Sequence, residues 1–413
     1  MEKLYERCCG IDVHKKVIVA CFRKGTSQEL KEFGTTTNEL LKLCDWLVSE
    51  SCQMVAMEST ASYWKPLYNV LESAELKAIV VNAHHMRNVP GRKTDSKDAE
   101  WIVDLLQHGL LKASYIPDKD QRELRELVGY RKSIVGERSR ELNRLQKMLE
   151  GANIKLSGTV SNINGKSARN ILEELIQGKE INTKERLEEL IDGRLKASRD
   201  QVLEDIKGIM SPLQRKMLKE VLLHIDELDK HIKNLDDEID KNMGDKYKEA
   251  IKYVDGVTGI AEDSAKAILS VIGTNMDRFP NANNLCSWAG VCPGNNESAK
   301  KRKSGRTTKG NKLLKVTLIN CAHAAVKVKT SYFAAQFKRI SAHRGKKRAY
   351  LAVAHSMLIA IYHILKDNVE FKDLGSEYYS QFNRERKINA YLKKLYSLGW
   401  EEGKKQQVAT ASI

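Results

Sequence analysis

The sequence lacks a long hydrophobic run and a secretory leader. Its 413 residues include no stretch of about 18 apolar residues of the kind that crosses a membrane. Residues 1–7 also lack the apolar segment of a signal peptide. We therefore expect a cytoplasmic protein without a membrane partner.

Closely paired cysteines are missing as well. Eight Cys, at positions 8, 9, 21, 44, 52, 286, 292 and 321, show no C-x-x-C spacing and mostly lie in apolar segments. Zinc sites and redox motifs use paired cysteines, and disulfide frameworks belong to oxidising compartments. The cysteines are therefore interpreted as reduced core thiols.

Acidic residues are almost absent from one stretch. Between Gly290 and Tyr350 the sequence has 16 Lys or Arg and one acid, Glu297, so this stretch carries +15 of the net charge of +16. A surface that binds a polyanion needs such a concentration, because each neutralised phosphate releases condensed counterions. The alternative, a solvated basic face, usually mixes both signs. Nucleic acid is therefore the expected partner.

The N-terminal third predicts a mixed α/β sheet. A chain of this length suggests two or three domains, and its 41% hydrophobic content suffices for real cores. Alternation around Ile11 and Val13 predicts a strand, and a short Lys15-Lys16 connection leads to a second strand over 17–22. A third strand near 29–33 closes a meander. Strands at 53–58 and 76–82 then alternate with helices at 38–49, 61–74 and 96–107, which predicts helices packed on the sheet faces.

Four acids fall at the ends of these elements: Asp12, Glu58, Asp95 and Asp98. Asp12 alone could be a solvent-facing residue of an edge strand, and acids at a helix start could be simple caps. Together, the four carboxylates would repel one another unless a divalent cation neutralised them. Two Mg²⁺ ions, or Mn²⁺ in their place, could clamp the attacking and leaving oxygens of a phosphodiester. The acids therefore predict a two-metal nuclease or strand-transfer site.

A heptad pattern follows from about residue 119. Apolar residues recur every seven positions in two runs: Val128, Val135, Leu142 and Leu149, then Leu218, Ile225, Ile232 and Ile239 with Val221, Leu228 and Leu235. This spacing predicts a coiled coil. The two helices could pair within one chain as an antiparallel arm or between protomers.

The C-terminal part combines a glycine turn with a basic loop. Residues 254–260, followed by a helix at 264–271, resemble a helix-hairpin-helix, a weak signal by itself. Residues 287–311 then read as a Gly- and Asn-rich loop that contains Ser298 and Ser304. Candidate nucleic-acid-binding cations are Lys300, Lys301, Arg302, Lys303, Arg306 and Lys309.

Four motifs occur in a fixed order: Gly10-Ile11-Asp12-Val13-His14-Lys15, Met57-Glu58-Ser59-Thr60, Thr94-Asp95-Ser96-Lys97-Asp98-Ala99, and the loop from Trp288 to Asn311. They resemble those of the IS110/IS1111-type transposases. The resemblance implies an RNase H-like (RuvC-like) domain whose DEDD metal site matches Asp12, Glu58, Asp95 and Asp98. It also implies a coiled-coil region and a mainly helical transposase domain with an essential serine.

The family resemblance further implies recombinases of bacteria or archaea, near the nucleoid, that act on donor and target double-stranded DNA. A structured guide RNA pairs with both DNAs, and the proteins form dimers and tetramers. The expected domains are 1–118 (catalytic), 119–245 (coiled coil), 246–365 (transposase domain with the serine loop and basic patch) and 366–413 (helical tail).

Ser298 is the predicted nucleophile, at the position where the family motif places its serine. Many relatives have glycine soon after the serine, whereas this chain has Ala299 and Lys300. Ser304 is the rival position, and a serine in a polar loop can also simply cap a turn. Activation by the distant acids would require the two domains to meet, in one chain or across protomers. Alternatives to a transposase are a RuvC-like endonuclease that only hydrolyses DNA and a non-catalytic DNA-binding scaffold.

Overall fold

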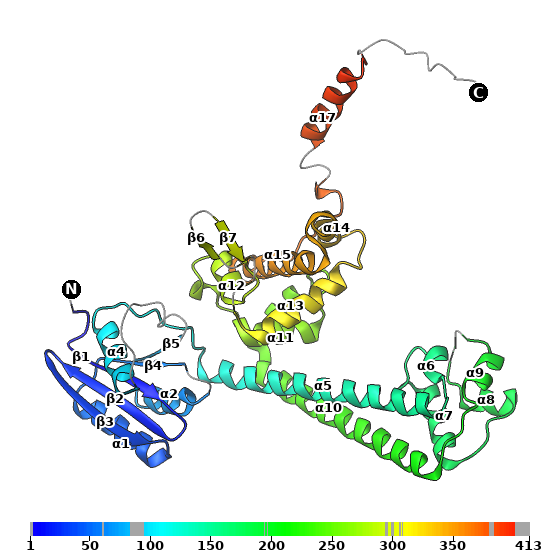
Figure 1. Cartoon of the computed structure of the whole chain (residues 1–413), viewed down its shortest axis with the longest axis horizontal. Helices are drawn as coiled ribbons and strands as arrows, with labels where there is room; N and C mark the ends of the chain where they lie inside the picture. The colour runs from blue at the N-terminus through cyan, green and yellow to red at the C-terminus, as the bar shows by residue number, and fades with distance from the viewer. Residues whose placement is uncertain are drawn as a thin grey trace. The chain divides into compact units, whose positions relative to one another are not determined.

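The structure, a computed structural model, describes residues 3–59, 62–82, 95–193, 195, 197–293, 296–298, 301–304, 307, 309–379 and 384–400. The side chains of residues 95–97, 296–298, 301–304 and 385–387 lie outside this description. The chain divides into two compact units, Met1–Asp118 and Lys119–Ile413 (Figure 1).

The first unit is built on a five-stranded mixed sheet with strand order β3-β2-β1-β4-β5. Strands β1 (Arg7–Val13), β2 (Val17–Lys24) and β3 (Ser27–Gly34) form the predicted antiparallel meander. Strands β4 (Met54–Glu58) and β5 (Ala78–Val81) continue the sheet in parallel with β1. The predicted fold class, a mixed N-terminal sheet followed by a mostly helical remainder, is confirmed.

Helices cover both faces of this sheet. Alternate residues of a strand point to opposite faces, so Ile11 and Val13 pack with α1 (Thr37–Ser49) and α2 (Trp64–Ser73). Cys8 of the same strand packs on the other face against α4 (Asp95–Gln107). Asp12 shares the parity of Cys8, so its side chain belongs to the face that α4 covers.

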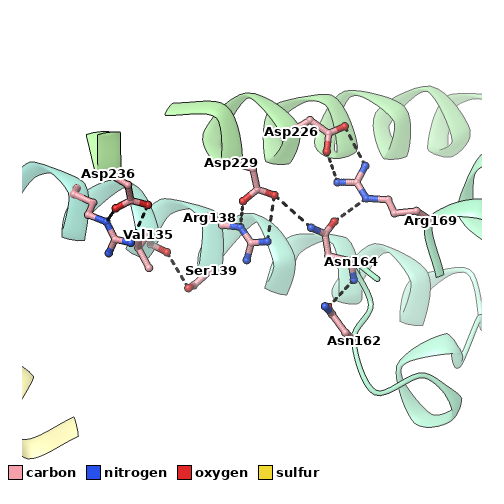
Figure 2. A network of polar contacts seen from close by, with 10 residues as sticks. Val135, Arg138, Ser139, Asn162, Asn164, Arg169, Asp226, Asp229 and Asp236 are labelled. Atoms are coloured by element: carbon pink, nitrogen blue, oxygen red, sulfur yellow. Dashed lines mark hydrogen bonds and ion pairs between the residues drawn. The ribbon is translucent and has the colours of Figure 1, made fainter. Parts of the chain in front are cut away.

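The second unit begins with a long antiparallel helix pair, α5 (Lys119–Gly151) and α10 (Pro212–Asp255). Arg131 pairs with Asp236 and Arg138 with Asp229, so the partner number falls by seven as the number on α5 rises by seven. Figure 2 shows the Arg138 contact. The sequence left open whether these helices pair within one chain, and in this structure they do. A regular coiled coil stays a prediction.

Four short helices join α5 to α10: α6 (Leu156–Thr159), α7 (Lys166–Gln177), α8 (Lys184–Leu190) and α9 (Arg199–Asp205). They share a core with heptad residues of both long helices, including Leu149, Leu218 and Ile225. Val135, Leu142, Ile232 and Leu235, also in the heptad pattern, are half-buried. We call α5 to α10 the arm.

The remainder contains helices and one small hairpin: α11 (Glu262–Ile272), the 3-10 turn η1 (Met276–Arg278), α12 (Ala282–Trp288), β6 (Asn296–Ser298), β7 (Lys301–Ser304), α13 (Lys312–Ala325), α14 (Tyr332–Arg344), α15 (Lys346–Asp367) and α17 (Arg384–Ser397). Among the described helices, α15 alone is long and apolar enough to cross a membrane, by length and composition only. Val353, Met357 and Ile361 of α15 are buried in a core shared with α11, α12 and α13. Its apolar composition is therefore accounted for by that core.

The turn between α10 and α11 requires glycine for packing. Gly259 has φ +87°, and a Cβ there would lie 2.4 Å from the backbone nitrogen of Ala325 in α13. No real Cβ contact is this short. Gly259, part of the segment that resembles a helix-hairpin-helix, is thus explained by the close approach of α13.

Candidate active site

Asp12 and Glu58 lie beside one another at the carboxyl ends of two parallel strands. The register of β1 and β4 pairs Ile11 with Met57, so the next residues along the two strands are neighbours on the same sheet face. The Asp12 side chain is buried, with 4% of the residue exposed, and Glu58 is half-buried. The strands therefore fix two of the four predicted acids at one edge.

The start of α4 reaches the same edge because the helix crosses β1 at Gly10. A Cβ at Gly10 would lie 2.3 Å from the backbone nitrogen of Val103 and 2.5 Å from the carbonyl oxygen of Ala99. Only glycine permits this approach. Asp98 lies directly before Ala99 in the first turns of α4.

The other end of α4 lies at the opposite edge of the sheet. The backbone nitrogen of Leu4, before β1, donates to the carbonyl oxygen of Gln107 at 2.8 Å. Arg23, near the end of β2, pairs with Asp104 at 2.7 Å. These contacts fix the direction of α4, so its first turns, which include Asp98, lie toward the edge that holds Asp12.

The structure therefore brings Asp12, Glu58 and Asp98 to one sheet edge, which we call the acidic edge. Asp95 begins α4, but its side chain lies outside the described residues. No group of three or more His, Cys, Asp or Glu side chains within the described ranges is arranged to hold a metal ion. The predicted Mg²⁺ site stays a prediction.

His14 contacts Asp12, and the sequence analysis did not predict this contact. Its Nε2 lies 2.8 Å from Oδ2 of Asp12, and half of the imidazole side chain (51%) remains exposed. The signal was available in the Asp12-Val13-His14 spacing, since residues two apart in an extended chain share a face. His14 therefore joins the candidate site as a neighbour of the buried carboxylate.

The nearby cysteines do not add soft ligands to this site. Cys8 and Cys21 pack on the same sheet face as α4. Burial raises the pKa of Cys8 to about 11 and that of Cys21 to about 11, so both thiols stay protonated at neutral pH. All eight cysteines of the chain are free. Apart from the imidazole of His14, the donors at the acidic edge are carboxylate oxygens, which suit a hard cation such as Mg²⁺ or Mn²⁺.

Part of the loop predicted over residues 287–311 is a β-hairpin, which the sequence analysis did not predict. β6 and β7 are antiparallel: Ser298 pairs with Lys301, and Asn296 pairs with Ser304. Ser298 ends β6 next to the chain reversal, whereas Ser304 lies at the open end of the hairpin. We call residues 296–304 the serine hairpin.

The predicted cations lie in and after this hairpin. Lys301, Arg302 and Lys303 belong to β7, and Lys309 is exposed before α13. Lys300 and Arg306 lie outside the described residues. Whether these side chains contact nucleic acid stays a prediction.

The base of the hairpin is joined to the helical core. Pro293 and Thr307 form a bridge between its two flanks. Lys315 of α13 donates from Nζ to the hydroxyl of Thr307 at 2.6 Å. The flanks of the hairpin are thus joined to each other and to α13.

Two family models match the chain. Residues 9–154 match the DEDD transposase model of the IS110 type, and residues 252–338 match the transposase IS116/IS110/IS902 family. A comparison with curated proteins found no match. The first matched region contains all four predicted acids, and the second contains Ser298 and the serine hairpin. The chain belongs to the IS110-type transposases.

Proposed function

We propose that this transposase cuts and rejoins DNA with the acidic edge, completed by Asp95, and with Ser298 as nucleophile. One observation carries the first half of the proposal: the β1–β4 register sets buried Asp12 beside Glu58 at the edge that the start of α4 reaches. Carboxylates are held there on rigid elements, as a catalytic site requires.

The donor set fits a divalent cation. Asp12, Glu58, Asp95 and Asp98 would hold it with carboxylate oxygens, which Mg²⁺ prefers, and Mn²⁺ can take its place. When bound, the metal would neutralise the carboxylates and stabilise charge on the phosphodiester oxygens. The contribution that we propose for the chain is to bring Asp12, Glu58 and Asp98 to one sheet edge, where the metal would bind. Asp12 is buried there and contacts His14.

Ser298 supplies the covalent step in this proposal. Its Oγ attacks phosphorus, an Oγ–P bond forms, and the bond from phosphorus to one deoxyribose oxygen breaks. The serine proton passes to a base, and the leaving oxygen takes up a proton as a hydroxyl. Attack by a hydroxyl of another DNA end reverses the reaction and rejoins the strands. The sequence of β7 includes three cations close to Ser298, and positive charge near the nucleophile would favour a phosphodiester and its transition state.

A covalent adduct tests the assignment of the nucleophile. Reactions with end-labelled DNA are stopped by denaturation and examined for labelled protein. We expect an adduct in the wild type and in Ser304→Ala, and none in Ser298→Ala. The reverse pattern would move the nucleophile to Ser304, and product without any adduct would exclude covalent catalysis.

Sequencing of the products separates the transposase from its alternatives. Rejoined donor–target junctions are the expected result. Simple nicks would instead favour a RuvC-like endonuclease that hydrolyses DNA, a function for which the acidic edge suffices. Uncut DNA would favour a scaffold.

Guidance by a structured RNA and assembly into dimers or tetramers complete the proposal. Both come from the family resemblance. The charge distribution supports the RNA: residues 1–118 have 15 Lys or Arg and 16 Asp or Glu, a net charge of −1, which leaves +17 for residues 119–413. Such a surplus suits more than one polyanion.

A further inference from the structure

Helices α13 and α14, together with α15 as far as Lys366, form a region without acids. Residues 311–366 include eleven Lys or Arg and no Asp or Glu. The cations are densest where α14 ends and α15 begins. Arg344, Lys346, Lys347 and Arg348 lie there within five residues, and all four are exposed. We call these four residues the α14–α15 corner.

Several cations elsewhere in the same unit are paired with acids. In the arm, Arg138 contacts both carboxylate oxygens of Asp229, and Arg169 contacts both of Asp226. Figure 2 shows this succession of pairs along α10. At the corner, by contrast, the described residues form no ion pair with any of the four cations. The corner therefore differs from an ordinary solvated face, which mixes both signs.

The corner is electrostatically unfavourable in the free protein. α15 begins at Lys346 with no acid in its first turn, so three cations occupy the helix end where the backbone dipole favours anions. They also repel Arg344 and one another. A polyanion bound at the corner would relieve both effects.

The corner stands on a packed support. Tyr350, one turn after Lys346, stacks on His323 of α13 with ring centroids 3.6 Å apart. Its other neighbour is Phe337 of α14, with centroids 4.4 Å apart. Ala349 between the cations and Tyr350 is fully buried. The start of α15, which carries three of the cations, is therefore packed against two other helices, α13 and α14, unlike a flexible basic tail.

We propose that the α14–α15 corner binds the phosphate backbone of a nucleic acid, as a contact separate from the serine hairpin. Lys and Arg bind phosphates without reading the bases, so this contact is independent of sequence and depends strongly on salt. Neither Ser298 nor the acidic edge takes part. The proposal therefore stands or fails independently of the covalent step described above.

The test compares two triple variants of the full-length protein that change net charge equally. The corner variant is K346Q/K347Q/R348Q. The control, K219Q/K230Q/K233Q, neutralises three exposed lysines of α10. Affinity for a labelled DNA duplex of random sequence and for a labelled RNA hairpin of random sequence is measured over a range of salt concentrations.

Log affinity falls as log salt rises, and we expect this negative slope to become shallower in the corner variant. The change should be about 0.9 per lost duplex contact, or about two to three units for the triple variant. The control should leave the slope unchanged. The melting temperature of the corner variant should stay equal or rise, because repulsion is removed. The probe with the larger loss identifies whether DNA or RNA occupies the corner.

Two results would overturn the proposal. Equal loss of slope in both triple variants would mean that net charge alone acts, and an unchanged slope in the corner variant would mean that its cations only face solvent. A second variant, Arg344→Gln, changes only the last residue of α14 and leaves α15 intact. It should reduce the magnitude of the salt slope by about one unit.

Discussion

At the scale of single residues, the acidic edge makes Asp12 the most sensitive position. Asp12→Asn keeps the size of the buried side chain but removes its charge. We expect loss of several kcal/mol of transition-state stabilisation, about a thousandfold in cleavage rate, with DNA binding retained. Gel assays of cleavage and binding measure the two effects.

Asp104→Asn is the matched control for this variant. Asp104 lies on α4 but at the opposite edge of the sheet, where it pairs with Arg23 and is partly exposed. Its replacement should leave cleavage within about twofold of wild type, because exposed ion pairs contribute little. If Asp12→Asn retained cleavage, the acidic edge would play no part in the chemistry.

Gly10→Ala tests the close approach of α4 to β1. The added Cβ has backbone atoms of Val103 and Ala99 as its nearest neighbours, and neither can rotate away. We expect destabilisation of the first unit by about 1–3 kcal/mol, together with slower cleavage, since Asp98 would move with α4. Thermal unfolding and cleavage assays measure both.

Gly129→Ala provides the contrasting glycine. Apart from its chain neighbours and the nearby backbone of α5, no described atom lies within 4 Å of a Cβ built at Gly129, in the interior of that helix. Alanine should therefore stabilise this helix by about 0.5–1 kcal/mol. Equal destabilisation by both substitutions would contradict the steric explanation of Gly10.

The acids at the sheet edge could be predicted because their signals are local. The alternation of apolar residues along β1 and the apolar run of β4 predicted where both strands end. The positions of Asp12 and Glu58 at those ends could therefore be predicted. The contact of His14 with Asp12 was not predicted, although the two residues lie two apart, because the spacing shows only a shared face and not a contact between the side chains. The need for glycine at position 10 was also hidden, because it depends on where α4 crosses the strand.

At the scale of elements, the core at the joined end of the arm should determine its local stability. Leu145 of α5 is fully buried in that core, whereas Leu213, near the start of α10, is 67% exposed. Leu145→Ala should cost about 2–5 kcal/mol. Leu213→Ala should change stability by less than about 0.5 kcal/mol.

Hydrogen exchange of the α5 and α10 amides measures this difference locally. A local probe is needed because a chain of two units need not unfold in one step. Faster exchange in Leu145→Ala, with unchanged exchange in Leu213→Ala, is the expected outcome. Similar exchange in both variants would mean that the arm does not depend on this core.

The heptad spacing predicted which faces of the two long helices are apolar but not their partner. A seam repeated every seven residues suits pairing within one chain or between chains equally. The antiparallel direction is visible only from contacts such as Arg131 with Asp236. The serine hairpin was missed for another reason: Asn, Ser, Lys and Arg form its strands, and their composition does not predict β-structure.

At the scale of the whole molecule, the acidic edge and the excess positive charge lie in different units. The first unit carries the acidic edge and a net charge of −1, and the second carries +17. Polyanion binding is therefore expected to reside mainly in the second unit, which also holds the serine hairpin and the α14–α15 corner. This division was predictable from the sequence, because charge counts need no structure.

The division of charge bears directly on the proposed guide RNA. The second unit, with a net charge of +17, is expected to bind any nucleic acid at low salt. Co-purification of RNA is therefore not by itself evidence of guidance. A guide must be a discrete RNA whose removal changes where DNA is cut. We expect protein purified from cells that carry the whole insertion sequence, with the transposase gene and its flanks, to retain one predominant RNA, identified by sequencing. After ribonuclease treatment, cleavage at specific sites should be lost while salt-dependent binding to random duplex persists. Retained RNA of random sequence, or unchanged site-specific cleavage after ribonuclease, would show that the second unit binds RNA only as a polyanion.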